Sequence, residues 1–292
     1  MRARNNKKSK ILITGTNGQL GRCLQAVSEK YPNYDFYFKN SKQLDITRKE
    51  QIDILFAQEK FDFCVNCAAY TAVDKAESDQ ENAFLVNAEA VKYLAETCKA
   101  NNTTLIHIST DFVFDGTKGT PYTEDDLPNP INVYGASKLK GEQYIQEILN
   151  NYFIIRTSWV YSEYGHNFVK TMLRLGTKRD EISVVNDQIG SPTYAGDLAK
   201  AIMEIISAKT TSFGLYHYTN EGTTSWYDFA KTIFEIKEIK IKVNPISSNN
   251  YTTQAKRPMY SVLDKTKIKQ VFNIIIIPNL ENSLKEVIYN TL

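Results

Sequence analysis

Tyr134 and Lys138 lie four residues apart, a spacing that puts both side chains on one face of a helix. Upstream, Ser109, Thr110 and Asp111 end an apolar run that predicts a strand. The hydroxyl groups of Ser109 and Thr110 are therefore expected at the carboxyl edge of a sheet, where α/β proteins bind ligands. A phenol, an amine and a hydroxyl group can together polarise a carbonyl and donate a proton to its oxygen. The pattern predicts a site that reduces a ketone.

Such a reduction needs a hydride at carbon and a proton at the developing alkoxide. A free tyrosine has a pKa of about 10. A lysine ammonium favours the phenolate, so we expect Lys138 to lower the pKa of Tyr134 toward working pH. Lys138 can also hold the nicotinamide ribose, and Thr110 can hydrogen-bond the substrate oxygen. The alternative is an exposed tyrosine and a solvated lysine on an ordinary helix, because this spacing alone is common by chance.

A glycine-rich loop follows the first predicted strand and opens a helix. Its residues are Gly15, Thr16, Asn17, Gly18, Gln19, Leu20 and Gly21. Glycines there allow a tight turn and close approach of the backbone to a pyrophosphate, while the helix N-terminus stabilises the phosphate charge. The loop predicts a dinucleotide site, although a plain strand-to-helix turn has the same spacing.

The end of the second predicted strand is expected to contact the adenosine ribose, where an acidic residue favours a free 2′-hydroxyl group. Lys39, Asn40 and Ser41 stand there, without a carboxylate. The chain is therefore expected to accept NADPH and leaves NADH open as a cofactor. Asp45 follows shortly after, and it either lies near the adenine or serves a helix cap or turn.

The elements that must position these residues alternate, as in βαβ units. Helices are expected to begin near Gln19, Thr47, Gln80 and Val133, and Thr47 with Glu50 makes a capping-box pattern. The strands read as apolar runs, which suits a doubly wound parallel Rossmann-like sheet covered on both faces. The predicted strands are Lys10–Thr14, Phe36–Lys39, Phe61–Ala68, Thr104–Ser109 and Phe153–Ser158.

The alternation weakens beyond about residue 180, so a smaller C-terminal lobe is expected to bind substrate. Helical periodicity returns in Ala195–Ala208, Ser225–Glu235 and Leu280–Thr291. We expect a basic tail at 1–9, a mainly dinucleotide-binding domain at 10–178 and a mainly substrate-binding lobe at 179–292. The two parts are expected to interleave, because no linker separates them.

Composition excludes several classes of protein. A formal net charge of +2 gives little support to nucleic-acid binding. The apolar runs Ile11–Thr14 and Ile274–Ile277 are too short to span a bilayer. Cys64 and Cys67 could suggest half of a zinc site, but no second close pair exists, so core thiols are expected. Cysteines inside predicted strands and helices indicate a reducing, cytoplasmic location.

Taken together, the chain resembles the extended short-chain dehydrogenases/reductases, and within them the dTDP-4-dehydrorhamnose reductase family. The resemblance covers nearly the whole chain in order. Its most specific parts are the Ala-Ala-Tyr-Thr-Ala-Val-Asp and Arg-Thr-Ser-Trp-Val-Tyr segments. The matching segments are Thr14–Gly21, Asn66–Glu77, Ser109–Phe114, Asn132–Lys138, Arg156–Tyr161, Asn186–Thr193 and Arg257–Pro258.

The resemblance implies reduction of the C4 ketone of a dTDP-linked sugar by NADPH or NADH. It implies that Thr110, Tyr134 and Lys138 are the catalytic set. Ala68, Ala69 and Thr71 would line the cofactor, while Val73 and Trp159 would contact the sugar. Judged without the resemblance, Trp159 would more often belong to the core.

Three positions bear on substrate and assembly. Phe112 stands where the family often has tyrosine, so it would keep a packing role beside the substrate and lose a hydroxyl contact. Arg257 is expected to bind the diphosphate through its forked guanidinium group, although a surface salt bridge is a close alternative. Some family members form magnesium-bridged dimers through a glutamate, and Gly196 aligns with it here. No metal site is therefore expected, and the chain should be a monomer or weak homodimer.

Two other functions fit parts of the pattern. A sugar-nucleotide dehydratase or epimerase would return its NAD unchanged, but dehydratases carry an acidic pair after the threonine, and here Asp111 is followed by Phe112. A noncatalytic regulatory subunit, like the beta subunit of methionine adenosyltransferase, could retain the tyrosine and lysine. Net consumption of NADPH separates a reductase from both.

Overall fold

A six-stranded parallel sheet forms the centre of the molecule, in the order β10-β5-β4-β3-β1-β2. A computed structural model describes residues 8–272 and 276–290. The strand order switches sides at β1: β2 pairs with one edge of β1, and β3 pairs with the other. Such a switch point is where open α/β sheets bind ligands. The doubly wound parallel sheet expected from the sequence is confirmed.

Strands and helices alternate through the first half of the chain. They are β1 (Ser9–Thr14), α1 (Gln19–Ser28), β2 (Tyr34–Lys39), α2 (Lys49–Gln58), β3 (Phe63–Asn66), α3 (Val73–Ala76), α4 (Gln80–Phe84), the π-helical turn η1 (Leu85–Glu89), α5 (Ala90–Asn101), β4 (Thr104–Thr110), the 3-10 turn η2 (Asp111–Val113), α6 (Val133–Ile148) and β5 (Tyr152–Thr157).

The second half has shorter strands. They and their helices are β6 (Val160–Tyr161), α7 (Phe168–Gly176), β7 (Glu181–Val185), β8 (Ile189–Gly190), β9 (Thr193–Tyr194), α8 (Ala195–Ala208), β10 (Gly214–His217), β11 (Thr224–Ser225), α9 (Trp226–Ile236), β12 (Lys242–Ile246), the 3-10 turn η3 (Ser248–Asn250), α10 (Thr266–Val271) and α11 (Leu280–Asn290).

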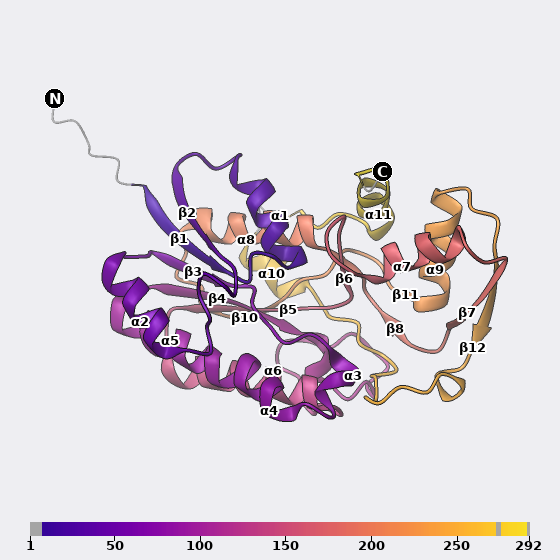
Figure 1. The fold of residues 1–292 in the computed structure, drawn as a ribbon, viewed down its shortest axis with the longest axis horizontal. Coiled ribbons are helices and arrows are strands. Elements are labelled where there is room, and N and C mark those ends of the chain that lie inside the picture. The colour runs from indigo at the N-terminus through magenta and orange to yellow at the C-terminus, as the bar shows by residue number, and fades with distance from the viewer. Residues whose placement is uncertain (1–7, 273–275, 291–292) are drawn as a thin grey trace.

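Helices cover both faces of the sheet. One face packs with α2, α5 and α6, through residues such as Leu12, Leu94 and Ile145, and the other packs with α1 and α8, through residues such as Ile13 and Ile202 (Figure 1). Successive residues of a strand point to opposite faces, so a strand covered on both sides must be apolar throughout. This explains the continuous apolar runs in the sequence.

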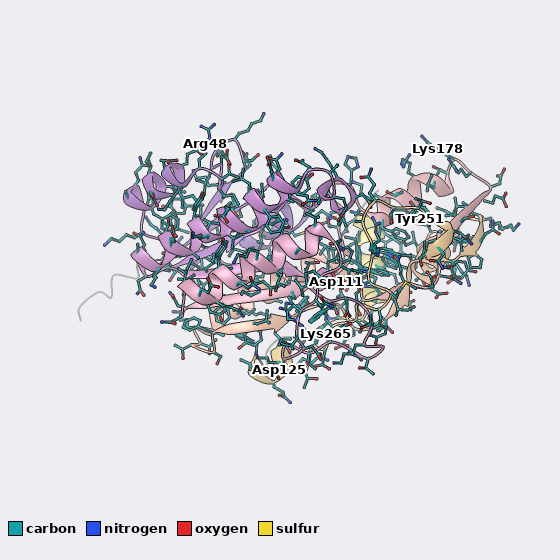
Figure 2. All side chains as sticks on the ribbon, turned by 90° about the horizontal axis from the view of Figure 1, so that it is seen from below. Arg48, Asp111, Asp125, Lys178, Tyr251 and Lys265 are labelled. Carbon is teal, nitrogen blue, oxygen red and sulfur yellow. The ribbon has the colours of Figure 1, made fainter. Side chains whose placement is uncertain are left out.

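The chain interleaves its two parts. Helix α8 and strand β10 come from the predicted substrate lobe, yet α8 packs on α1 and β10 pairs with β5 at the sheet edge. The smaller lobe has its own core, built from α7, α9, α11 and β7. Figure 2 shows this lobe at one end of the elongated molecule, with Lys178 and Tyr251 on it. The exact domain boundary stays a prediction.

Several local expectations differ from the structure. The capping box is wrong: α2 begins at Lys49, no side chain caps it, and the Thr47 hydroxyl group donates to Asp45 Oδ1 at 2.7 Å. The hydroxyl group is thus engaged by the aspartate and does not accept from an amide group of the helix. Strand β3 ends at Asn66, so Cys67 lies beyond it. Residues 1–7 of the predicted tail 1–9, residues 274–275 of the second apolar run and Thr291 lie outside the described residues.

A buried ion pair fixes α6 against the sheet. Arg156 on β5 donates through Nε and Nη2 to the Glu142 carboxylate, at 3.0 and 2.7 Å. Both side chains are about 2% exposed or less, and the Ser109 hydroxyl group also donates to Glu142. Glu142 lies one helical turn after Lys138, so this contact fixes the helix face that carries Tyr134 and Lys138.

Replacing Arg156 by methionine should lower the free energy of unfolding by about 3–5 kcal/mol, because the Glu142 carboxylate stays buried without its partner. Urea denaturation measures the loss. The paired change Arg156→Met with Glu142→Leu removes both charges and should recover most of the stability. A single variant as stable as the parent would contradict this account of the contact.

Candidate functional site

A cavity of about 830 Å³ lies at the carboxyl ends of β1, β3 and β4. It joins the glycine loop, the Tyr–Lys pair and the smaller lobe in one space. The predicted site residues that line it are Gly15, Asn17, Gly18, Gln19, Leu20, Gly21, Asp45, Ala68, Ala69, Thr71, Val73, Thr110, Phe112, Tyr134, Lys138, Trp159 and Arg257. Lys39 and Asn40 are not among its lining residues.

The glycine loop has the geometry of a phosphate cradle. Gly15 has φ +66°, and a Cβ atom there would lie 2.5 Å from the backbone nitrogen of Ala68. Only glycine allows β1 and the loop after β3 to approach so closely. Gly18 is the N-cap residue of α1, and no side chain caps that helix. The amide groups of its first turn can therefore bind an anion, which fits a dinucleotide pyrophosphate.

The far end of the cavity is formed by the segment after β2. Ser41, Leu44, Asp45, Ile46 and Thr47 line it. Asp45 also accepts hydrogen bonds from Thr47, so it has the turn role left open by the sequence and faces the cavity as well. Asn40 Oδ1 accepts from the backbone of Lys42 and Gln43. Contacts of Lys39 and Asn40 with a 2′-phosphate stay a prediction.

Helix α6 carries the Tyr–Lys pair into the cavity. Asn132 Oδ1 accepts from the Gly135 amide at 2.7 Å and caps the helix. A Cβ atom on Gly135 would lie 2.1 Å from the Phe112 carbonyl oxygen, so glycine lets the helix touch η2. The Phe112 ring meets Tyr134 edge-on, with centroids 5.7 Å apart. Tyr134 is thereby held next to Thr110.

The charge state of Tyr134 differs from the expectation. Burial raises the pKa of Tyr134 to about 12, and its hydrogen bond with Thr110 lowers the pKa only partly. Without a bound ligand, the phenol is the stable form at neutral pH. The expected lowering of the Tyr134 pKa is wrong, because burial disfavours the charged phenolate and the Asp111 carboxylate raises the pKa as well. Burial also lowers the pKa of Lys138, to about 8.

Lys138 is almost fully enclosed, with 2% of its surface exposed. Its Nζ atom donates to the Ile108 carbonyl oxygen at 2.6 Å and lies 3.2 Å from His107 Nε2. His107 is itself fully buried on β4. The sequence analysis missed His107, and only its place two residues before Ser109 on a predicted strand could have indicated it.

An aromatic pair forms the wall on the side of the smaller lobe. Trp159 and Trp226 stack with ring centroids 3.4 Å apart, and both line the cavity. Trp159 has φ +48°, an uncommon conformation for a bulky residue and one that clusters at functional sites. Trp226 was also missed, since the sequence analysis places it only at the start of a predicted helix.

Arg257 is held by an acidic residue of the other part of the chain. Its Nη2 and Nη1 atoms donate to Asp74 Oδ2 and Oδ1 at 2.7 and 3.1 Å. The salt bridge left open by the sequence is therefore present, and the guanidinium group still lines the cavity. This contact holds the loop that carries Arg257 near α3. Binding of a diphosphate by Arg257 stays a prediction.

Cys67 is not the core thiol that the sequence predicted. It lines the cavity beyond β3, whereas Cys64 is buried, and all four cysteines are free. Among the described residues no group of three His, Cys, Asp or Glu side chains could hold a metal ion. None of the described helices has the length and apolar character needed to cross a membrane.

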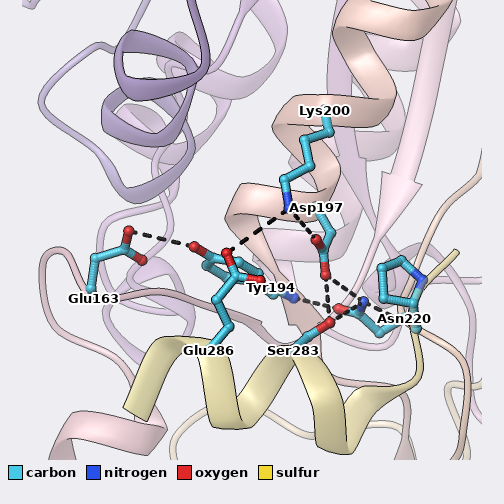
Figure 3. A network of polar contacts seen from close by, with 8 residues as sticks. Glu163, Tyr194, Asp197, Lys200, Asn220, Ser283 and Glu286 are labelled. Atoms are coloured by element: carbon cyan, nitrogen blue, oxygen red, sulfur yellow. Dashed lines mark hydrogen bonds and ion pairs between the residues drawn. The ribbon is translucent and has the colours of Figure 1, made fainter. Parts of the chain in front are cut away.

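Asp197 follows Gly196, the position aligned with the family's metal-binding glutamate, and its carboxylate has partners within the fold. It is buried in the first turn of α8 and accepts from Asn220 Nδ2 at 2.9 Å and from Lys200 at 3.1 Å (Figure 3). Ser283 on α11 donates to it as well. The carboxylate thus links α8 with α11. Activity without a metal ion stays a prediction.

Known proteins match the chain along its length. Residues 9–292 match the family described as RmlD substrate binding domain. A dTDP-4-dehydrorhamnose reductase of Aggregatibacter actinomycetemcomitans is 44% identical over 276 residues, which are 91% of this chain and 94% of the relative. The enzyme of that name from Sinorhizobium fredii is 41% identical over 289 residues, 96% of this chain and 97% of the relative.

A solved structure agrees with these matches. The dTDP-4-dehydrorhamnose reductase of Bacillus anthracis in complex with NADP is 42% identical, with a TM-score of 0.92, and the match covers 98% of this chain and 100% of that one. The parallel sheet, the glycine loop and the Tyr–Lys pair define a Rossmann-type, dinucleotide-dependent reductase. Within that class, the chain belongs to the dTDP-4-dehydrorhamnose reductase family.

Gly18 offers a direct test of the phosphate cradle. A Cβ atom there meets only the Gly15 carbonyl oxygen, at 3.3 Å. The variant Gly18→Ala should therefore fold and keep most of the affinity for the cofactor. Gly18→Asp adds a negative charge at the helix N-terminus and should weaken NADPH and NADH together, by tenfold or more in calorimetry. Equal affinity in both variants, each folded, would remove the loop from the phosphate site.

Proposed function

We propose that this chain reduces the C4 ketone of dTDP-4-dehydro-L-rhamnose to dTDP-L-rhamnose, using NADPH or NADH. The observation that carries the proposal is the convergence of Thr110, Tyr134 and Lys138 with the glycine loop in one cavity. Family membership supports the substrate, and the NADP complex of the Bacillus anthracis relative supports NADPH. Lys39, Asn40 and Ser41 include no carboxylate that would repel a 2′-phosphate, so NADPH is accepted, and NADH stays open as a second cofactor.

The chain's own residues fit the cofactor. The amide groups at the start of α1 would hold the pyrophosphate, Ala68, Ala69 and Thr71 would line the nucleotide, and Lys138 would hold the nicotinamide ribose. When bound, the reduced nicotinamide supplies the hydride. Thr110 orients the carbonyl oxygen of the substrate beside Tyr134.

Tyr134 is the proton donor in this proposal. With a pKa raised to about 12 by burial, its phenol is protonated at neutral pH and ready to donate. The proton passes from the phenol oxygen to the substrate oxygen as the hydride reaches the carbon, which leaves an alcohol and a phenolate. The phenolate is a strong base and takes up a proton readily. Lys138 lines the same cavity one turn further along α6 and, with a pKa of about 8, can supply that proton.

Residues of both parts of the chain would bind the rest of the substrate. Val73 and Trp159 would contact the sugar, and Trp226 extends the same aromatic wall. Phe112 would pack beside the sugar, and Arg257 would bind the diphosphate. We also propose a cytoplasmic location for this enzyme and a monomer or weak homodimer, with no nucleic-acid or membrane partner.

Two other functions are distinguished by one assay. A dehydratase or epimerase would return its cofactor without net consumption, and a regulatory subunit would only bind it. Asp111 offers one acidic group after Thr110, with burial raising its pKa to about 7, but Phe112 supplies no second acid. Stoichiometric consumption of NADPH with dTDP-4-dehydro-L-rhamnose therefore identifies the reductase.

The change Tyr134→Phe keeps the ring and removes the proton. Turnover should fall by roughly 10²–10⁴, the usual range for a general acid. Affinity for NADPH, measured by calorimetry, should hardly change, because the phenol is not proposed to hold the phosphates. Activity within a few-fold of the parent would contradict the assignment of Tyr134 as the proton donor.

The two tryptophans of the chain are both in the stack, so tryptophan fluorescence, excited selectively over tyrosine, reports on this wall. Trp226→Leu should raise KM about three- to tenfold with little change in kcat, since aromatic stacking contributes about 0.5–1.5 kcal/mol. Phe168→Leu is the matched control: its ring packs on Trp226, with centroids 4.6 Å apart, but is not a cavity-lining residue. Similar KM values in both variants would exclude direct contact of Trp226 with substrate.

A further inference from the structure

A row of polar side chains crosses the sheet beneath the cavity and ends at Lys138. Thr14, Asn66 and His107 are register partners on β1, β3 and β4, so their side chains share one face. All three are nearly or fully buried. Buried polar groups in an apolar sheet are costly unless hydrogen-bonded, and each of these groups has a partner.

The amide of Asn66 has only one orientation that satisfies its neighbours. The backbone N–H of Ala68 lies 3.2 Å from Oδ1 and can only donate, so this atom must be the acceptor. The Thr14 hydroxyl group also donates to Oδ1, at 2.6 Å. The amide nitrogen then faces His107 Nδ1 at 3.1 Å, and it can only donate.

The hydrogen bond from Asn66 therefore determines the tautomer of the His107 imidazole ring. Burial lowers the pKa of His107 well below its usual value, so the ring is neutral. Because Nδ1 accepts from Asn66, the single ring proton resides on Nε2. That N–H faces Lys138 Nζ, 3.2 Å away. An ammonium group has no lone pair to accept it, whereas a neutral amine does.

We propose that Asn66 and His107 are positioning residues for the proton step: Asn66 holds the His107 proton on Nε2, and that N–H favours the uncharged amine of Lys138 over its ammonium form. The Lys138 amine still donates one of its own protons to the Ile108 carbonyl oxygen. The inference rests on the proposed function, because it concerns how the proton given by Tyr134 is replaced.

The consequence is a lysine that releases its proton readily. After Tyr134 has donated to the substrate, an N–H bond of the Lys138 ammonium breaks and the phenolate O–H bond forms. The resulting amine accepts the His107 N–H, and a proton from water later restores the ammonium. Without the histidine proton on Nε2, the ammonium would be held more strongly and this return would be harder.

Other groups also act on Lys138. Glu142 lies one turn further along α6, Cys67 lies beyond β3, and Tyr134 lines the same cavity. Glu142 and Cys67 raise the pKa of Lys138, while burial lowers it. The Glu142 charge is paired with Arg156 on β5. The experiment therefore changes the direction of the Asn66–His107 hydrogen bond and leaves these groups in place.

The tautomer can be observed in the unaltered protein. The chain has three histidines, His107, His166 and His217, so the ring ¹⁵N resonances can be assigned with single variants. The Nε2 of His107 should carry the proton at neutral pH, with Nδ1 unprotonated. A proton on Nδ1 would overturn the inference, whether or not the enzyme reduces the proposed sugar, so its failure and that of the proposed function are distinguishable.

Asn66→Asp reverses the hydrogen bond with almost no change of shape. The carboxylate accepts from His107, which moves the ring proton to Nδ1 and leaves Nε2 as an acceptor for the lysine ammonium. The ¹⁵N spectrum should show this change, and the alkaline limb of the kcat/KM profile should move up by about one pH unit, a tenfold change in proton affinity.

Thr14→Val is the matched control. It removes the hydroxyl group from the same row, but the Ala68 amide still orients Asn66, so neither tautomer nor pH profile should change. Thermal unfolding checks that both variants fold. If both variants shift the profile alike, or if Asn66→Asp changes the tautomer and not the profile, the positioning role is wrong. If Asn66→Asp does not fold, the spectrum of the unaltered protein still decides.

Discussion

The burial of Lys138 is the constraint on which the site depends. An ammonium group out of water costs several kcal/mol unless partners compensate, and a buried lysine responds by losing its proton more readily. In this chain the compensation comes from the Ile108 carbonyl group and from the Glu142 charge one turn along α6. The same enclosure raises the pKa of Tyr134. Burial thus raises the pKa of Tyr134, the proposed proton donor, and lowers the pKa of Lys138, the proposed source of its next proton.

Rigid contacts maintain that enclosure. The Glu142–Arg156 pair joins α6 to β5, and the Ser109 hydroxyl group joins the same carboxylate to β4. Parallel strands bring their carboxyl ends to one edge, so the glycine loop after β1 and the segment after β3 meet there, with Gly15 against Ala68. Because the catalytic helix and the phosphate cradle are fixed to the same sheet, their separation is set by the sheet and does not depend on mobile loops.

The smaller lobe completes the cavity through few contacts. Arg257 is tied to Asp74, and Trp159 stacks on Trp226. Both pairs join segments distant in sequence, and each presents to the cavity a group suited to part of a nucleotide sugar: a cation for phosphate and an aromatic face for a ring. In the proposed function, substrate choice thus resides at these two pairs, while the chemistry resides on the sheet.

The sequence alone determined the fold class, the cofactor loop and the Tyr–Lys pair, because periodicity, glycine spacing and helical i, i+4 spacing are local properties of the chain. Motif resemblance added the family and most residues that line the cavity. The sequence did not reveal Trp226, the partners of Asp197 or the row from Thr14 through Asn66 to His107. Those contacts join strands and helices far apart along the chain, so their existence depends on sheet register and packing. Tertiary structure alone decided the protonation of Tyr134 and Lys138, because a pKa depends on how completely the folded chain excludes water from the group.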